Sequence, residues 1–323
     1  MIAGYPDRRR PVSLRVMHPA ADRILLFHRD YHGLTGGHLK VRHYYSHAEH
    51  SARFRPRIFF TPGSVRGSEN PWHGIAPPPL TSWRPSEAAA LFIAGLDWEA
   101  VPDPPPVPVI NLIQGVRHAD EGDPRRAFLA RPAVRICVSH EVATAIKSTE
   151  IVNGPVHVIP NGIDLGDLPS SALPRDTAVL IAGMKNPPFA KAVQDRLRLE
   201  GIHAECLVDP LSRGEFLERL SRSAVAVTLP LEREGFFLPA LEAMAVGAVV
   251  VCPDCVGNRG FCRDRETAFR PRYTVDAVVA AAIAAATQAP SDAAAMRAAA
   301  IAESKKHGLE AERLAFLRIL DAV

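Results

Sequence analysis

The chain has 323 residues, 47% of them hydrophobic and 23% charged, which is typical of a soluble globular protein with room for two α/β domains. A net charge of +3 is too small to favour a nucleic-acid partner, and no stretch approaches the roughly 18 apolar residues of a membrane helix. Five cysteines in this length do not indicate a disulfide scaffold. We expect a cytoplasmic protein. Peripheral contact with the inner face of a membrane stays open through three arginine-rich segments, Arg8–Arg15, Arg53–Arg57 and Arg125–Arg135.

The first half of the chain alternates short apolar runs with helical or polar segments. Gly36-Gly37 follows the first apolar run and precedes a helix that we expect to begin at His38. The irregular segment Thr61–Pro85 exceeds an ordinary connection and is either a mobile loop over a substrate site or a disordered insertion. The predicted strands of this half are Ile24–Phe27, Arg57–Phe60, Ala90–Ile93, Val107–Ile113 and Val134–Ser139.

A second series of apolar runs follows a stretch of linker composition, Leu165–Thr177. Alternation of strands and helices favours parallel sheets with right-handed crossovers. The sequence therefore predicts an α/β protein with two Rossmann-like, doubly wound domains that face a central cleft. Helices are expected at Val275–Ala286 and Leu309–Leu320. The predicted strands of the second half are Ala178–Ala182, His203–Val208, Ala224–Leu229 and Ala248–Cys252.

The segment Glu234–Gly247 is the most informative for function. Its two carboxylates, Glu234 and Glu242, flank a glycine loop and a helix start. Pro239 suits the beginning of a helix and Gly247 its C′ stop, which places Glu242 in the first turn. Carboxylates suit the vicinal hydroxyls of a sugar, and backbone N–H groups at a helix start suit phosphates. Because ligands of open α/β sheets bind beyond the carboxyl ends of strands, we expect a nucleotide-sugar pocket here.

This segment resembles the Glu-x7-Glu motif of retaining glycosyltransferases with the GT-B architecture, particularly glycosyltransferase family 4. Ile159–Asp164 resembles the family segment that closes the first domain, and Val249–Asn258 resembles its strand and glycine-rich loop after the motif helix. The resemblance implies an N-terminal acceptor domain over 1–165 and a C-terminal nucleotide-sugar donor domain over 166–305. It also implies a closing helix over 306–323 that can pack back on the first domain.

The resemblance assigns roles within the motif. Glu234 corresponds to the acid that binds hydroxyls of the transferred sugar, and Glu242 to the acid that binds the nucleotide ribose. The leaving diphosphate needs a cation near the first strand of the second domain, but Met184 stands where the family usually has arginine. Lys185 is our first choice for this contact and also a catalytic residue, and Lys191 is the second choice. The other expected donor-binding residues are Gly183, Gly235, Phe236, Phe237 and Leu238.

Residues of the first domain complete the expected cleft. Gly36 and Gly37 would lie beside the reacting sugar, as such a loop often does in GT-B enzymes. His118 is expected to hydrogen-bond the donor sugar as a catalytic residue, with ordinary packing as the alternative, and Arg117 to meet acceptor or phosphate. His140 is expected to cap or pack.

The sequence offers little support for a metal or a cofactor. It lacks an Asp-x-Asp pair for a divalent ion on a sugar diphosphate, and Cys252-Pro-Asp-Cys255 has no second pair to complete a zinc site. Three histidines, His43, His47 and His50, have helical spacing that could ligate a metal, but they more readily face the cleft or solvent. We therefore expect metal-independent chemistry without a cofactor.

The expected function is transfer of a hexosyl-type sugar, with retention, in glycan biosynthesis. UDP-sugars are favoured as donors and GDP-sugars come second, and the acceptor is a glycan, a lipid-linked molecule or a small molecule. Two alternatives stay open. One is a catalytically inactive GT-B-like binding or scaffold protein, which the departure at Met184 favours, and the other is a GT-B sugar-nucleotide epimerase.

Overall fold

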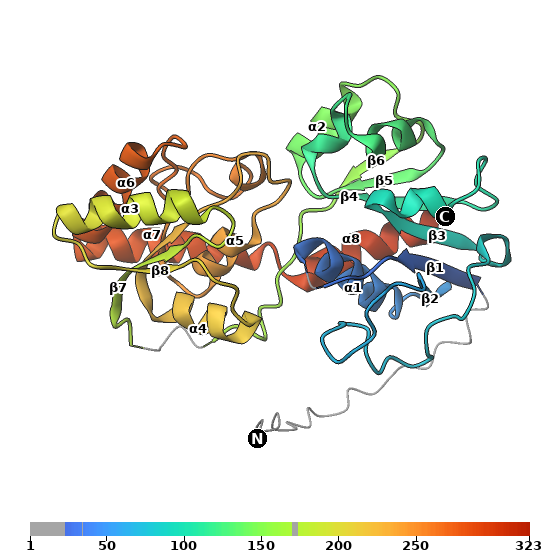
Figure 1. Ribbon diagram of the computed structural model, residues 1–323, viewed down its shortest axis with the longest axis horizontal. Coiled ribbons are helices and arrows are strands. Elements are labelled where there is room, and N and C mark those ends of the chain that lie inside the picture. The colour runs from blue at the N-terminus through green and yellow to red at the C-terminus, as the bar shows by residue number, and fades with distance from the viewer. Residues whose placement is uncertain (1–22, 34, 170–173) are drawn as a thin grey trace.

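The computed structural model describes residues 23–33, 35–169 and 174–323, and these form two α/β lobes side by side (Figure 1). Each lobe is built on one sheet, with six strands in the first and four in the second. Neighbouring strands in both sheets pair in parallel. The predicted fold class is thereby confirmed. The basic segment Arg8–Arg15 and the middle of the predicted linker, residues 170–173, lie outside the described residues.

The first sheet has the strand order β2-β1-β3-β4-β5-β6. Its central strands β3 and β4 are buried along their whole length and are apolar except for Asn111, because both faces of the sheet are covered. Pro56 lies in β2, where an edge position tolerates a residue that has no N–H. The short strand β6 at the other edge was not predicted. The strands are β1 (Arg23–Arg29), β2 (Phe54–Phe60), β3 (Ala90–Ala94), β4 (Val109–Ile113), β5 (Val134–Cys137) and β6 (Val156–Val158).

Helices cover one face of the first sheet. These are α1 (Gly36–Ala48), α2 (His140–Lys147) and α8 (Leu309–Ala322), and they share a core with aromatic residues such as Phe92 and Phe316. The other face is covered by Trp98 of η2 (Gly95–Ala100) and by Phe128 of η4 (Pro124–Ala130). Two further 3-10 segments are η1 (Pro85–Glu87) and η3 (Val116–Ala119), and Val116 of η3 packs in the core on the helix side.

The segment Thr61–Pro85 packs against the first lobe. Trp72 is buried and lies edge-on to Tyr31 and Phe60, and the Asn70 side chain accepts a hydrogen bond from the Trp72 backbone at 2.9 Å. The expectation of a disordered insertion is therefore wrong, because this buried tryptophan and its turns attach the segment to the sheet.

The second sheet has the order β10-β9-β7-β8. Alternate residues of its strands face opposite layers: Leu180 packs towards α4 and α5, whereas Val179 packs towards α3 and α6. This two-sided cover makes the lobe doubly wound. Its elements are β7 (Thr177–Ala182), α3 (Pro187–Leu199), β8 (Ala204–Leu207), α4 (Arg213–Arg222), β9 (Ser223–Thr228), α5 (Leu238–Ala245), β10 (Val249–Val251), η5 (Val256–Asn258), α6 (Val275–Thr287) and α7 (Pro290–Lys305).

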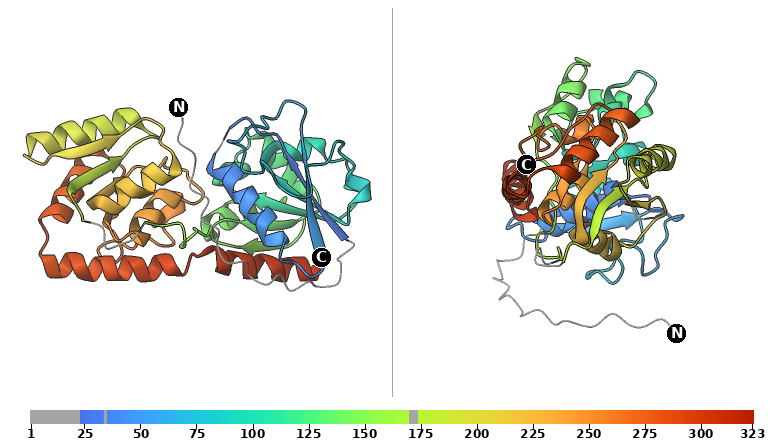
Figure 2. Two further views of the ribbon diagram at one scale, coloured as in Figure 1. Left: turned by 90° about the horizontal axis from the view of Figure 1, so that it is seen from below. Right: turned by 90° about the vertical axis from the view of Figure 1, so that its left-hand side faces the viewer.

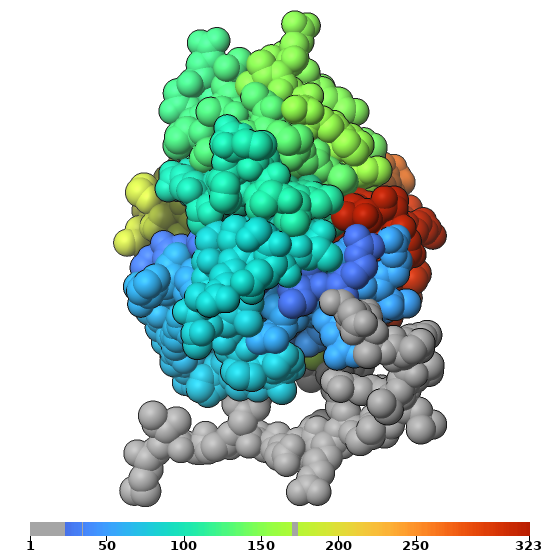
Figure 3. Space-filling view, turned by 90° about the vertical axis from the view of Figure 1, so that its right-hand side faces the viewer, coloured from blue at the N-terminus to red at the C-terminus, as the bar shows by residue number. Residues whose placement is uncertain are grey.

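The chain crosses between the lobes twice, and the two crossings are hydrogen-bonded to each other. Ile163 donates to the His307 carbonyl at 2.8 Å, and Leu309 donates to the Ile163 carbonyl at 3.1 Å. Helices α7 and α8 then run along one side of both lobes (Figure 2). Helix α8 packs against α1, and its end reaches the surface of the first lobe (Figure 3).

A buried ion cluster fastens α8 to α1. The Glu312 carboxylate accepts from the Lys40 ammonium at 2.5 Å and lies 3.1 Å from the His47 ring, and it also accepts from the Gly162 backbone N–H. Burial alone would raise the pKa of Glu312, but Lys40 and His47 lower it to about 2. Of the three helically spaced histidines, His47 is thus engaged with the Glu312 carboxylate, and the described residues contain no cluster suited to a metal ion.

Candidate functional site

The strand orders identify one edge of each sheet as the place for a ligand. Strand order reverses between β1 and β3 in the first sheet and between β7 and β9 in the second. Ligands of open α/β sheets bind at the carboxyl ends of strands beside such a reversal. In the second lobe, this edge holds the loop from Gly183 to Asn186 and the loop from Leu229 to Phe237. The Glu234 carboxylate is therefore placed at the topological switch point.

The motif helix α5 begins at Leu238 and ends where Gly247 adopts a φ of +78°. The predicted C′ stop is therefore present. Glu242 is the fifth residue of the helix, so it lies in the second turn and not in the first as expected. The dipole at the helix start consequently does not explain this carboxylate, whose side chain is only 3% exposed.

The Glu234 carboxylate pairs with Lys185, the first-choice cation of the sequence analysis. Their side chains are 16% and 44% exposed, respectively, and the Lys185 ammonium also lies 5.4 Å from the centre of the Phe237 ring. Met184 packs instead against the core below the motif helix. One basic side chain thus faces the sugar-binding candidate, and a methionine occupies the neighbouring position.

The Glu242 carboxylate pairs with Arg213, which sequence reasoning missed. Arg213 is the first residue of α4, and its guanidinium lies 2.5 Å from the Glu242 carboxylate. Ser212 fixes the start of that helix through a capping box with Glu215. The Ser-x-x-Glu pattern was visible in the sequence, but nothing local indicated that the arginine would meet a carboxylate 29 residues later.

The two lobes touch at Gly235. A Cβ atom there would lie 2.1 Å from the Gln114 carbonyl oxygen, so only glycine fits this approach. The Gln114 side chain donates to the Gly37 carbonyl at 3.3 Å, which connects the motif loop to the start of α1. Gln114 directly follows β4 and was not predicted as a site residue. Its backbone carbonyl lies against the motif loop, and its side chain reaches the start of α1.

The segment 256–258 packs against the backbone of the motif loop. Phe237 donates to the Gly257 carbonyl at 2.9 Å, and a Cβ atom on Gly257 would collide with the backbone of Phe236 at 2.6 Å. The buried Asn258 side chain donates to the Pro253 carbonyl at 2.9 Å and to the Cys252 sulfur at 3.1 Å. The resembling segment Val249–Asn258 therefore shapes the motif loop through its backbone.

The predicted first-lobe residues differ in their burial. Gly36 and Gly37 form the first turn of α1, which begins two residues before the predicted His38 because Thr35 caps it. His118 is buried, its Nδ1 lies 2.9 Å from the Gly115 carbonyl, and burial lowers its pKa to about 4. It is therefore neutral near pH 7. Arg117 is exposed.

The remaining second-lobe predictions have mixed surroundings. Gly183 is required by packing, since a Cβ atom would lie 2.1 Å from Ala190 of α3. Lys191 is exposed on the same helix. Phe236 and Leu238 are partly buried against the core. Only Phe236 among them lines the cavity described next.

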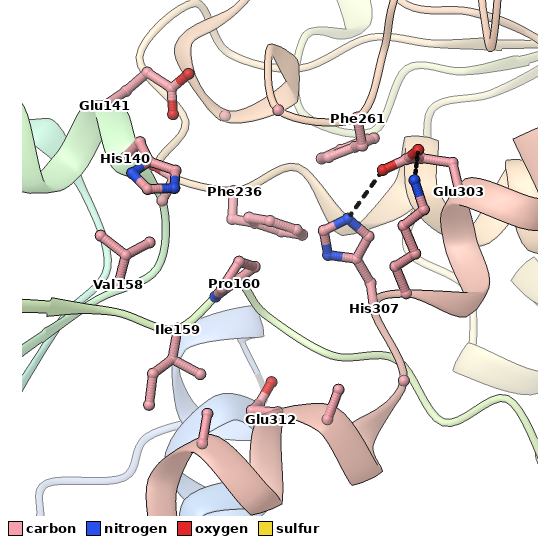
Figure 4. A pocket seen from close by; sticks show the side chains of 17 residues that line it. His140, Glu141, Val158, Ile159, Pro160, Phe236, Phe261, Glu303, His307 and Glu312 are labelled. Atoms are coloured by element: carbon pink, nitrogen blue, oxygen red, sulfur yellow. Dashed lines mark hydrogen bonds and ion pairs between the residues drawn. The ribbon is translucent and has the colours of Figure 1, made fainter. Parts of the chain in front are cut away.

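A cavity of about 390 Å³ lies where the two crossings meet the motif loop (Figure 4). Phe236, Phe261 and His307 approach one another in it, with ring centres 5.2 to 5.9 Å apart. On its far wall, Glu303 pairs with Lys306 at 2.8 Å. His140, expected to cap or pack, lines this cavity at the start of α2.

The arginine-rich segment Arg125–Arg135 is largely engaged within the fold. Arg135 is fully buried and donates to Asn111 at 2.6 Å, and burial lowers its pKa to about 10. Arg131 donates to the Val101 carbonyl at 2.9 Å. The stretch Arg125–Arg135 is therefore not a continuous basic surface. None of the helices in the described ranges is long and apolar enough to cross a membrane.

Comparison with known proteins relates the second lobe to glycosyltransferases. Residues 168–289 match the family model described as "Glycosyl transferases group 1". No curated protein matches the chain.

Three solved structures share the fold over nearly the whole chain. A sucrose-phosphate synthase from Thermosynechococcus elongatus has a TM-score of 0.67 at 15% identity, covering 93% of this chain and 98% of that one. HepE from Anabaena in complex with UDP-glucose has a TM-score of 0.69 at 13% identity, covering 93% and 100%. A glycosyltransferase from Rickettsia africae has a TM-score of 0.65 at 12% identity, covering 92% and 97%.

The family match covers the region that holds the motif. The family model includes both carboxylates of the motif and both cations paired with them. The chain thus has the two-lobed GT-B fold, and its second lobe is similar to group 1 glycosyltransferases.

Proposed function

We propose that the protein is a retaining glycosyltransferase that moves a hexosyl-type sugar from a nucleoside diphosphate to an acceptor without a metal ion. The observation that carries this proposal is the pair of motif carboxylates at the switch-point edge, each held by one basic side chain. Such an edge receives a ligand that offers hydroxyls to the carboxylates and negative charge to the cations.

The donor lies along the motif in this proposal. Glu234 accepts hydrogen bonds from hydroxyls of the transferred sugar, and Glu242 accepts from the ribose. When the donor binds, Lys185 leaves Glu234 and contacts the diphosphate. Its positive charge then offsets the repulsion between the diphosphate and the two carboxylates. Leu238 and Ala240, in the first turn of α5, add backbone N–H groups that have no partner within the helix.

The chemical step breaks the bond between the anomeric carbon and the diphosphate oxygen. Lys185 and the start of α5 stabilise the charge that develops on this oxygen, the kind of preorganised electrostatics that often dominates catalysis. For retention, the acceptor hydroxyl attacks the anomeric carbon from the face that the diphosphate leaves, and its proton passes to the leaving phosphate. Lys185 supplies the positive charge that a divalent ion provides in other sugar-diphosphate enzymes.

The acceptor approaches from the first lobe in this proposal, near Gly36, Gly37 and Arg117, with neutral His118 as a hydrogen-bonding group. Contact between Gly235 and Gln114 brings the lobes together over the reacting atoms. Closure of this kind excludes water and limits hydrolysis of the donor.

UDP-sugars are the first donors to test, with GDP-sugars second. HepE, which shares the fold, was solved with UDP and with UDP-glucose. The acceptor class stays open among glycans, lipid-linked molecules and small molecules. Bound nucleotide should raise the thermal unfolding midpoint by mass action, so a panel of nucleoside diphosphates identifies the base.

The decisive experiment follows radiolabelled UDP-glucose and GDP-mannose in wild type and in Glu234→Gln. Wild type should transfer or slowly hydrolyse one donor with retained configuration, and Glu234→Gln should lose about 100-fold or more in rate. Glu232→Gln is the matched control, because Glu232 is an exposed acid of the same loop. Unchanged activity in Glu234→Gln would refute the site. Conversion of the donor into a different nucleotide sugar without any acceptor would identify an epimerase, and absence of any turnover would favour the binding or scaffold alternative.

A further inference from the structure

Arg213 occupies a position that packing alone does not explain. It is the first residue of α4, its side chain is 37% exposed, and it reaches a carboxylate whose own side chain is only 3% exposed. Long basic side chains at the start of a helix are unfavourable next to the helix dipole. The negative charge of Glu242 offsets this unfavourable interaction with the helix dipole.

The guanidinium is only partly used by this contact. Arginine has five N–H donors, and Glu242 is the sole hydrogen-bond partner of the Arg213 side chain in the described part of the chain. Glu242 likewise has no second side-chain partner among the described residues. Both groups therefore keep hydrogen-bonding capacity, and the Arg213 end of the pair is open to solvent while the Glu242 end is buried.

The charge of Arg213 also influences residues of the first lobe. Burial is the main cause that lowers the pKa of His43 to about 3, Lys40 is the second, and Arg213 adds to the same effect. Arg213 contributes in the same direction to the lowered pKa of Lys40, which burial dominates. Because Lys40 and His43 belong to α1, the positive charge of Arg213 acts across the boundary between the lobes.

A carboxylate beside a guanidinium matches the chemistry of a vicinal diol. Each hydroxyl can donate its proton to the carboxylate and accept an N–H from the arginine, so both polar groups of the pair are satisfied together. We propose that Arg213 and Glu242 form one ribose subsite, in which Arg213 donates to the vicinal hydroxyls that Glu242 accepts from. This inference rests on the proposed function and adds the residue that reads the ribose together with the motif.

The test compares UDP with 2′-deoxy-UDP and 3′-deoxy-UDP by calorimetry, and GDP with its deoxy forms in parallel. Wild type should prefer at least one ribonucleotide by about 10-fold or more, the usual size of a hydrogen bond to a charged group. Arg213→Ala should bind that ribonucleotide about 10-fold or more weakly and reduce the ribo-to-deoxy ratio to below about 3-fold. Arg219→Ala is the matched control, since Arg219 lies on the same helix and pairs with Glu205.

Two further variants separate a loss of binding from a loss of folding. Arg213→Ala leaves a buried carboxylate without its cation, so Glu242→Gln and the double variant Arg213→Ala/Glu242→Gln repeat the comparison without that charge. If one subsite exists, the double variant should bind UDP no more than about 3-fold more weakly than the weaker single variant.

Two results would overturn the inference while leaving the proposed function intact. One is unchanged UDP affinity in Arg213→Ala, and the other is weaker binding with the ribo-to-deoxy ratio retained for both positions. If wild type binds neither UDP nor GDP, the proposed function itself fails, and this inference fails with it.

Discussion

Two groups of side chains in this molecule are each built around one buried acid with basic neighbours. The two acids differ in the number of hydrogen bonds that they accept. At the crossing between the lobes, the Glu312 carboxylate receives hydrogen bonds from Lys40, His47 and the Gly162 backbone. At the sheet edge, Glu242 receives one contact from Arg213. Both carboxylates are shielded from water, yet only the first has its lone pairs largely occupied by the protein.

The difference separates an acid that holds the fold from an acid that is free to hold a ligand. A saturated carboxylate has no capacity left for a hydroxyl, and moving it would unpair several groups at once. A carboxylate with one partner at an open edge can accept from a ligand at little cost. We therefore expect substitutions in the first group to affect stability and substitutions in the second to affect binding.

Lys40→Met should have the largest effect and should act on stability. It removes the cation from a fully buried carboxylate, a change that costs about 3–5 kcal/mol of the free energy of unfolding. Urea denaturation of Lys40→Met and of Lys185→Met measures the contrast, because Lys185 is 44% exposed. Equal loss in the two variants would contradict the distinction between saturated and open acids.

The same cluster predicts a pH dependence. The pKa of Glu312 is about 2 in the folded protein against 4.5 for a free glutamate side chain, so its contribution to stability is fully present above about pH 4.5. That contribution is lost as pH falls through about 2. Urea denaturation should be measured at several pH values between these two limits. The free energy of unfolding should decline less for Glu312→Gln than for wild type as the pH falls. Parallel declines would assign acid sensitivity to other groups.

Glu242→Ala should chiefly weaken nucleotide binding, by about 10- to 150-fold, as expected for hydrogen bonds to a charged group. Since the ribose is bound equally in ground and transition states, KM should rise more than kcat falls. Calorimetry with UDP and GDP measures the affinity, and Glu218→Ala, an exposed acid on α4, is the control. An unchanged affinity would remove Glu242 from the donor site.

Sequence reasoning succeeded where the signal was local. The spacing of Glu234 and Glu242, the strand before them and the stop at Gly247 are all encoded within about 25 consecutive residues. The start of α1 was missed because glycines are poor helix formers, and the cap at Thr35 overrides that preference.

Contacts between distant segments could not be predicted in this way. Arg213 meets Glu242 only after β9 and α5 fold against α4, and Gln114 meets Gly235 only after the two lobes dock. The partner of Lys185 was likewise hidden, because nothing near it in sequence shows that β7 and β9 would be neighbours. Site residues that depend on docking therefore require the structure.

Gly235→Ala tests the docking contact between the lobes. The added Cβ atom would lie 2.1 Å from the Gln114 carbonyl oxygen and 3.0 Å from the Gly115 Cα atom, backbone atoms that can yield only if the lobes separate. Overpacking of this kind costs about 1–3 kcal/mol, so kcat/KM should fall by about 5- to 150-fold. X-ray scattering should show a larger radius of gyration. Gly122→Ala, at a glycine with open space around it, is the control, and equal activity of both variants would exclude a role for this contact.

Arg233→Ala should have the smallest effect of these changes, although its ion pair also crosses between the lobes. Arg233 contacts Asp120 at 2.7 Å, and both side chains are more than a third exposed. Hydrogen bonding from Arg233 lowers the pKa of Asp120, but exposed pairs are screened by salt and contribute little to stability. The unfolding midpoint should therefore match that of wild type, and any loss of transfer activity should disappear as salt is raised. A loss as large as that of Gly235→Ala, persisting at high salt, would show that charge pairing rather than backbone fit holds the lobes together.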